Sequence, residues 1–163
     1  MTIDGRPYLV FVDELGNGGA RIIDISDEKH PKVVSEMKLQ IQLPANSTVA
    51  SGEANSAFGY NGHYCGVPRE VDPEVVACSY FESGVRVFDI RDPVHPKEIA
   101  YFNPGGDTTP KPGSERNGGT SGYTSAQPRI IPERGEIWFT DQDRGFYVVR
   151  FTNGAWPFAP PAG

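Results

Sequence analysis

The chain has 163 residues, which is the length of a single domain. Its 21 acidic and 15 basic residues give a formal net charge of -6, and this balance, without any basic cluster, argues against nucleic acid as a partner. No apolar run is long enough to span a membrane, while 19 Gly and 15 Pro are typical of a turn-rich β protein.

Taken in chain order, short runs rich in Val, Ile, Phe and Tyr predict β-strands with turns between them. The expected strands are 8–13, 20–26 and 32–43, then 63–67, 75–80, 85–91 and 97–102, and finally 129–131, 136–141 and 146–152. No segment shows the period of a helix. Short strands at regular spacing indicate an all-β meander.

An internal repeat organises these strands. Residues 19–32, GARIIDISDEKHPK, align without a gap to residues 84–97, GVRVFDIRDPVHPK, and eight of the 14 positions are identical. Residues 145–151 match the second copy in apolar pattern only. The single domain, 1–163, therefore divides into three units at about 8–43, 62–103 and 127–152, joined by long loops at 44–62 and 104–127. We expect the first unit to lack its first strand and the third unit to lack its last.

Three segments resemble the LVIVD-repeat β-propeller proteins of bacteria. They are residues 63–79, 84–102 and 128–151, which include HYCGVPREVDPEVVACS, the turn DIRDPVHPK and the run ERGEIWFTD. The resemblance implies a partial β-propeller of about two and a half four-stranded antiparallel blades, and it implies no activity. Because a closed propeller needs about four blades or more, we expect copies of the chain to associate as a homo-oligomer, with an open monomer as the alternative.

Acidic side chains are expected to gather at one end of the strands. Strand direction puts the loops between second and third strands at the same end as the long loops between units. These loops carry Glu14, Glu53, Glu82, Asp141 and Asp143. Such oxygen ligands suit Ca²⁺, so this set is a candidate metal site. The alternative is a solvated, charged rim, because no complete calcium-loop motif is present.

His63 is the candidate general base. It enters the first strand of the second unit, the strand nearest the axis of a propeller, and Tyr60 and Tyr64 flank it. With Asp141 it forms the predicted catalytic pair. The alternative is a polar residue that is satisfied at a strand end. His30 and His95 recur with Asp27 and Asp92 in matching turns, so we interpret them as turn structure rather than as catalytic groups.

The two cysteines, Cys65 and Cys78, lie on either side of a predicted hairpin loop and should be close to opposite each other. A cross-strand disulfide would fit that geometry. Because the N-terminus has no export signal, the expected compartment is the reducing cytoplasm, and we favour two buried thiols. An exported parent protein stays open if the chain is a fragment.

Two functions fit these patterns. The first is a binding module that takes a small molecule or a protein through its acidic loop face. The second is a Ca²⁺-dependent hydrolase of the lactonase type, acting on a lactone such as an acyl-homoserine lactone, in which the ion polarises the carbonyl and activated water attacks it. No nucleotide loop and no hydrolase elbow is present, so no organic cofactor is expected.

Overall fold

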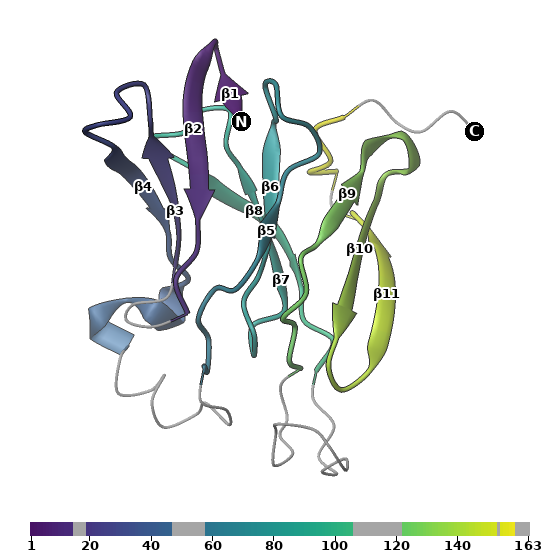
Figure 1. Cartoon of the computed structure of the whole chain (residues 1–163). Helices are drawn as coiled ribbons and strands as arrows, with labels where there is room; N and C mark the ends of the chain where they lie inside the picture. The colour runs from purple at the N-terminus through teal and green to yellow at the C-terminus, as the bar shows by residue number, and fades with distance from the viewer. Residues whose placement is uncertain (15–18, 47–57, 106–121, 153, 159–163) are drawn as a thin grey trace.

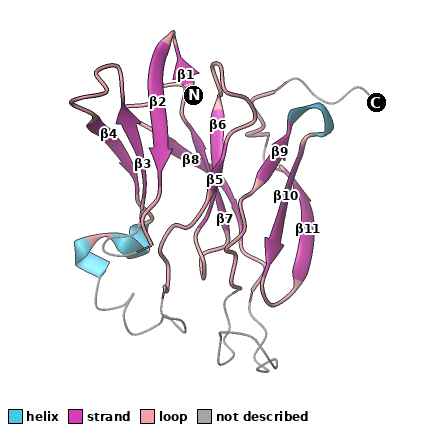
Figure 2. Cartoon of the chain, viewed as in Figure 1, coloured by secondary structure: helices cyan, strands magenta, loops and turns pink. Residues whose placement is uncertain are grey.

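The computed structural model describes residues 1–14, 19–46, 58–105, 122–152 and 154–158. In these ranges the regular structure consists of β-strands and three single-turn 3₁₀ helices, with no α-helix, which confirms the all-β class (Figure 2). None of the described helices is long and apolar enough to cross a membrane.

The strands form three antiparallel sheets (Figure 1). Sheet 1 contains β1 (Thr2–Ile3), β2 (Arg6–Phe11), β3 (Ala20–Asp24) and β4 (Lys32–Met37). Sheet 2 contains β5 (Cys65–Gly66), β6 (Val75–Ser79), β7 (Val85–Asp89) and β8 (Lys97–Phe102). Sheet 3 contains β9 (Arg129–Ile131), β10 (Glu136–Asp141) and β11 (Gly145–Arg150). In each sheet, strands that follow one another in the chain are neighbours.

Sheets 1 and 2 share more than their strand order. Each has one register shift between its third and fourth strands, at Ile22/Ile23 in sheet 1 and at Val87/Phe88 in sheet 2. The two positions are equivalent in the sequence alignment. Such a shift bends a strand and increases its twist, so the outer strands of both sheets have the same distortion.

Two expectations about strands are wrong. The first unit does not lack its first strand, because β1 pairs with β2 through Thr2↔Pro7 and Ile3↔Arg6. The turn between them is Asp4-Gly5, with φ values of 50° and 73°, which is the conformation of a two-residue hairpin turn. The expected strand 32–43 is also too long: β4 ends at Met37, and a 3₁₀ helix, η1 (Gln40–Gln42), follows.

The three sheets pack face to face, with sheet 2 in the middle. One apolar cluster lies between sheets 1 and 2 and includes Ile22, Val76 and Phe88. A second lies between sheets 2 and 3 and includes Val87 and Ile137. All five residues of β6 are buried because alternate side chains enter opposite clusters. Each fully buried aliphatic side chain contributes about 1.5–3 kcal/mol, so these two layers stabilise the stack.

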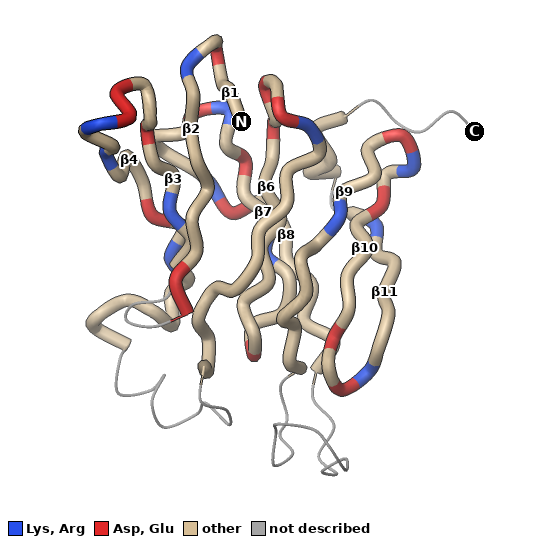
Figure 3. The backbone as a smooth tube through the Cα atoms, in the orientation of Figure 1, with Lys and Arg blue, Asp and Glu red and all other residues tan. Residues whose placement is uncertain are grey.

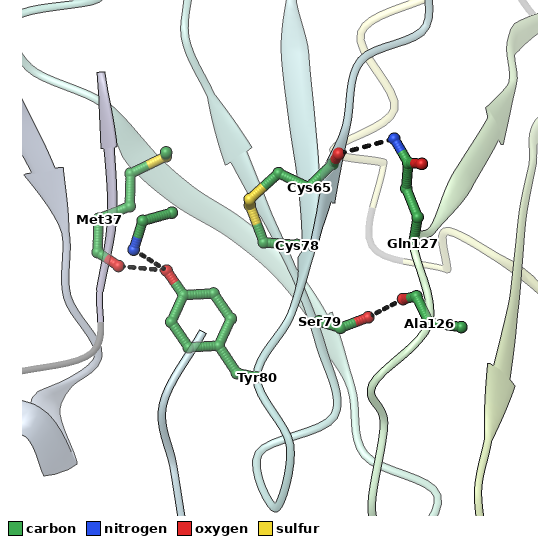
Figure 4. Close-up of a disulfide and its surroundings, with 8 residues drawn as sticks. Met37, Cys65, Cys78, Ser79, Tyr80, Ala126 and Gln127 are labelled. Carbon is green, nitrogen blue, oxygen red and sulfur yellow. Dashed lines mark hydrogen bonds between the residues drawn. A yellow bond between two sulfur atoms is a disulfide. The ribbon is translucent and has the colours of Figure 1, made fainter. Parts of the chain in front are cut away.

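Polar contacts from sheet 2 fix the sheets on either side (Figure 4). The buried Tyr80 hydroxyl donates to the Met37 carbonyl and accepts from the Ala20 amide at 3.2 Å, and burial raises the pKa of Tyr80. On the other side, Ser79 Oγ donates to the Ala126 carbonyl, and Gln127 Nε2 donates to the carbonyl of Cys65 at 2.9 Å.

Cys65 and Cys78 form a disulfide between β5 and β6, which corrects the expectation of two free thiols. The two residues are direct partners in the strand register, with Cα atoms 4.0 Å apart. The predicted opposition of the cysteines is therefore confirmed. The preference for thiols was wrong because it came from the expected compartment and not from the geometry of the hairpin.

Candidate functional site

The β6–β7 and β10–β11 connections lie at one end of the stack, which we call the loop face, together with the described parts of the β2–β3 connection and of the two connections between sheets (Figure 1). It carries the described candidates His63, Glu14, Glu82, Asp141 and Asp143. Charged residues of both signs gather at the opposite end of the sheets (Figure 3). Glu53, the fifth candidate metal ligand, lies outside the described residues.

His63 has an acceptor at each ring nitrogen. Nδ1 lies 2.5 Å from the carbonyl oxygen of Ser125, and Nε2 lies 2.5 Å from Glu14 Oε1. A carbonyl oxygen can only accept, so Nδ1 donates to Ser125. Glu14 thus occupies the nitrogen that a general base would use. The contact with Glu14 ties the β2–β3 loop to the segment before β5, and the contact with Ser125 ties that segment to the one before β9.

Aromatic rings surround this pair. The His63 ring stacks on Phe81 with centroids 4.9 Å apart, and Phe58 and Tyr123 each lie 5.0 Å from Phe81. Phe81 has a φ of 28°, a backbone conformation that costs a bulky residue about 1–3 kcal/mol. Its carbonyl accepts from the Thr124 amide at 2.9 Å. Phe81 therefore joins the chain segments that precede β5 and β9.

Asp141 is a fully engaged carboxylate. Its Oδ2 accepts from the Tyr123 amide at 2.7 Å and from Thr124 Oγ1 at 3.1 Å. Its Oδ1 accepts from the amides of Asp143 and Arg144 at 2.9 and 3.1 Å. With four donors and 2% exposure, this side chain closes the β10–β11 hairpin and holds the segment before β9 against it.

The remaining carboxylates do not come together as a metal site. Glu82 and Asp143 are buried, at 1% and 8% exposure. Within the described ranges, no group of three or more His, Cys, Asp or Glu side chains is arranged to hold a metal ion. Of the predicted site residues that the structure describes, two pairs are in direct contact: His63 with Glu14, and Asp141 with the backbone amide of Asp143.

His30 and His95 have the turn role that their repeat predicts. In each turn the aspartate, Asp27 or Asp92, accepts a hydrogen bond from the backbone amide two residues later. The distances are 3.1 Å from Lys29 and 3.0 Å from Val94. Its second oxygen lies 2.8 Å from His30 Nδ1 in one turn and 2.9 Å from His95 Nδ1 in the other. The histidine contact lowers the pKa of each of these aspartates.

A cavity of about 670 Å³ lies elsewhere, between sheets 2 and 3. We call it the groove. Its apolar wall comes from both sheets: Val85, Val87, Ile99, Ala100 and Phe102 from sheet 2, and Ile137, Val149 and Phe151 from sheet 3 and the residue after it. Arg86, Glu98, Tyr101, Arg150 and Thr152 complete the lining. The Arg86–Glu98 ion pair, at 2.9 Å, leaves neither of these charges unpaired.

The groove exists because sheet 3 has one strand fewer than sheet 2 in the described residues. Phe102 of β8 points toward sheet 3, with its ring 6.0 Å from Phe139 and 5.5 Å from Tyr147. β11 is the edge strand of sheet 3, and it pairs with β10 alone among the described strands. Beyond β11, the apolar side of β8 has no described strand of sheet 3 opposite it.

The groove was missed in the sequence, although a signal for it was present. The sequence does predict that the third unit lacks its fourth strand. The neighbouring unit, however, keeps its own fourth strand, with the apolar residues Ile99, Ala100 and Phe102. A four-stranded sheet packed on a three-stranded one must leave an uncovered apolar strip, and that consequence could have been drawn.

No model of a known protein family matches the sequence, and no curated protein is similar to it. The resemblance to LVIVD-repeat propellers therefore stays a prediction. The class that the fold defines is an all-β protein of three stacked antiparallel sheets with an apolar groove beside an edge strand.

Proposed function

We propose that this chain is a partial β-propeller that works as a binding module, and that its ligand is an extended peptide which adds a fourth strand to sheet 3. The observation that carries this proposal is the coincidence of an apolar groove of about 670 Å³ with the open edge of β11. An edge strand presents a row of backbone donors and acceptors, and peptides bind such edges by strand addition.

The neighbouring sheet supplies a template for the ligand. β11 begins at Gly145, and β7 begins directly after Gly84. These two glycines are aligned in the sequence, so β11 is the counterpart of β7. On β7 the next position in the sheet is filled by β8, which pairs from Val85↔Phe102 to Asp89↔Lys97. A strand with the chemistry of β8 is therefore the expected occupant of the equivalent position on β11.

The groove wall sets the pattern of that peptide. A strand lying on the β11 edge turns alternate side chains toward Val87, Ala100 and Phe102, so these positions should be apolar. The other side chains face away from the groove and can be polar. Main-chain hydrogen bonds would give the affinity and the apolar pockets the selectivity.

The described carboxylates of the loop face support this role less well than the groove does. Asp141 has four hydrogen-bond donors, Glu14 is paired with His63, and Glu82 is buried. The Ca²⁺-dependent lactonase stays a prediction that no contact among the described residues favours. Part of its ligand set, Glu53, is outside them.

A labelled synthetic peptide tests the proposal. Its sequence is that of residues 95–104, HPKEIAYFNP, which contains β8, and its binding is followed by fluorescence anisotropy. We expect saturable binding, and no binding of a scrambled peptide. Methylation of every second peptide nitrogen should abolish binding in one of the two alternate sets and spare it in the other, because alternate amides of a strand point to opposite sides.

A variant locates the site. Ala100→Phe places a large side chain in the groove and should weaken peptide binding by about tenfold or more, or about 1.4 kcal/mol. Ala126→Phe makes the same change outside the groove lining and should leave binding unchanged. Equal binding of the scrambled peptide, or equal sensitivity to both variants, would show that the ligand is not a strand on β11.

A further inference from the structure

Sheet 1 packs on sheet 2, and sheet 2 packs on sheet 3, in the same relative orientation. One face of sheet 1 and the opposite kind of face of sheet 3 are therefore left open. We call the face of sheet 2 that meets sheet 3 its front, and the face that meets sheet 1 its back. Val85 and Val87 lie on the front and pack toward sheet 3. Val76, Cys78 and Phe88 lie on the back and pack toward sheet 1.

Sheet 1 packs on sheet 2 through the face that is equivalent to the front of sheet 2. Ala20 and Ile22 are the residues of β3 aligned with Val85 and Val87, and both are fully buried in the cluster against sheet 2. The back of sheet 1 is then the other side of its strands. Leu9, Phe11 and Val33 lie on it, at 47%, 44% and 55% exposure.

Sheet 3 packs on sheet 2 through the face that is equivalent to the back of sheet 2. The residues of β11 aligned with Val85 and Val87 are Phe146 and Val148, and they are 61% and 49% exposed. Ile137 and Phe139, on the opposite side of the sheet, are buried against sheet 2. Trp138 lies with Phe146 on the open front, their rings 6.1 Å apart.

Both contacts between the described sheets are therefore front to back, and this part of the chain ends in one open front and one open back. We propose that the partner for both is a second copy of this chain: the front of sheet 3 of each copy packs on the back of sheet 1 of the other. The interface continues the packing that already joins sheets 1, 2 and 3. It is a head-to-tail contact that closes after two copies.

Ring size favours two copies. Propellers close with about four to eight sheets. One copy supplies three sheets, so two copies supply a number inside this range, while one copy or three copies do not. Such a dimer would cover the apolar patches on both outer sheets, which a stack that stays open would leave in water.

On each open face the ion-paired residues lie toward one end of the strands. The middle of each face is apolar, and these two apolar regions would pack against each other in the dimer. On the back of sheet 1, Arg21 pairs with Glu36 near the loop face. On the front of sheet 3, Glu136 pairs with Arg150 toward the other end of the strands. Leu9 and Val33 lie between the two ends of sheet 1. Trp138 and Val148 lie between the two ends of sheet 3.

The test is the mass in solution of the whole chain, by light scattering after size exclusion. We expect about twice the 17.8 kDa of one copy. Phe11→Asp and Phe146→Asp, which alter one open face each, should both give monomers with unchanged circular dichroism. Val94→Asp changes a side chain of similar exposure, 47%, away from both faces and should stay dimeric.

Mixing the two monomeric variants distinguishes the geometry. A mixture of Phe11→Asp and Phe146→Asp chains can form one unaltered front-to-back contact, so dimer mass should reappear, more weakly than in the unmodified chain. A monomer at every concentration would overturn the proposal. So would a dimer lost in only one of the two variants, since that result indicates a face that pairs with its own copy.

Discussion

Asp141 illustrates how a carboxylate that looks functional in the sequence serves the fold. Its two oxygens accept four hydrogen bonds from the hairpin that it closes and from the preceding loop. Hydrogen bonds to charged groups contribute about 1.5–3 kcal/mol each, and a buried donor that loses its partner costs a similar amount. The residue therefore matters to stability before it matters to chemistry.

Replacing Asp141 with alanine should lower the free energy of unfolding by about 3 kcal/mol or more, as measured by urea denaturation. Glu133→Ala removes an exposed carboxylate at the other end of β10 and should change this free energy by less than about 0.5 kcal/mol. If Asp141→Ala keeps its stability but abolishes a Ca²⁺-dependent rise in melting temperature, Asp141 is a metal ligand as the sequence predicts.

Glu136 makes the stability of sheet 3 depend on pH. Its carboxylate, 3% exposed, contacts Arg134 Nε at 2.8 Å, Arg150 Nη2 at 2.6 Å and Trp138 Nε1 at 2.9 Å. The hydrogen bond from Arg134, followed by those from Arg150 and Trp138, lowers the pKa of Glu136 from 4.5 to about 2. Because the pKa is depressed in the folded state, the stabilisation is present above pH 4.5 and is lost as the pH falls through about 2.

We therefore expect the unmodified chain to be more stable than Glu136→Gln at neutral pH, with the difference shrinking below pH 4.5 and vanishing near pH 2. Thermal melts across this range, at one protein concentration, measure the difference. A gap in melting temperature that is the same at neutral pH and near pH 2 would show that the Glu136 charge contributes nothing.

At the scale of elements, the disulfide links the shortest strand of sheet 2 to its most buried one. β5 has two residues, and only the pairs Cys65↔Cys78 and Gly66↔Ala77 hold it to β6. Gly66 also lies so close to the Pro128 carbonyl that a Cβ there would approach it to 2.2 Å. A covalent link is thus placed where few backbone pairs are available.

Removing the link should destabilise the chain through the unfolded state. The cysteines are 13 residues apart, and closing a loop of this length is worth about 3 kcal/mol. We expect the double variant Cys65→Ala/Cys78→Ala, and the unmodified chain in reductant, to lose about this much in urea denaturation. An unfolding midpoint that does not move with reductant would contradict the role of the link.

Most strands could be predicted from the sequence, because alternation and turn residues are local properties. β8, β9 and β10 match their predicted ranges in full. β1 could not be found by alternation, since two residues cannot show a period, although Asp4-Gly5 marks its turn. The end of β4 was missed because Leu39 and Ile41 continue an apolar pattern into a 3₁₀ helix.

The candidate site was less predictable than the strands. The sequence places acidic loops at one end but does not say which carboxylates turn inward. Glu14 pairs with His63 across 49 positions of the chain, and Asp141 reaches back to Tyr123. These contacts depend on how sheets pack. The groove depends on the packing of two sheets of different width, which no single segment of sequence records.

At the scale of the whole molecule, the stack that the described residues form is open in two places. The open faces of sheets 1 and 3 belong to the packing direction, in which a further sheet would lie. The open edge of β11 belongs to the hydrogen-bonding direction, in which a further strand would lie. The first explains the proposed dimer, and the second explains the proposed peptide site, so each can fail without the other.

The most direct test of the peptide site is amide hydrogen exchange in β11 with and without the peptide of residues 95–104. Strand addition should slow exchange at alternate amides of Gly145–Arg150, those that face away from β10, and leave the amides bonded to β10 unchanged. Exchange in β11 that is unaffected by saturating peptide, or protection confined to the loop face, would contradict the central claim.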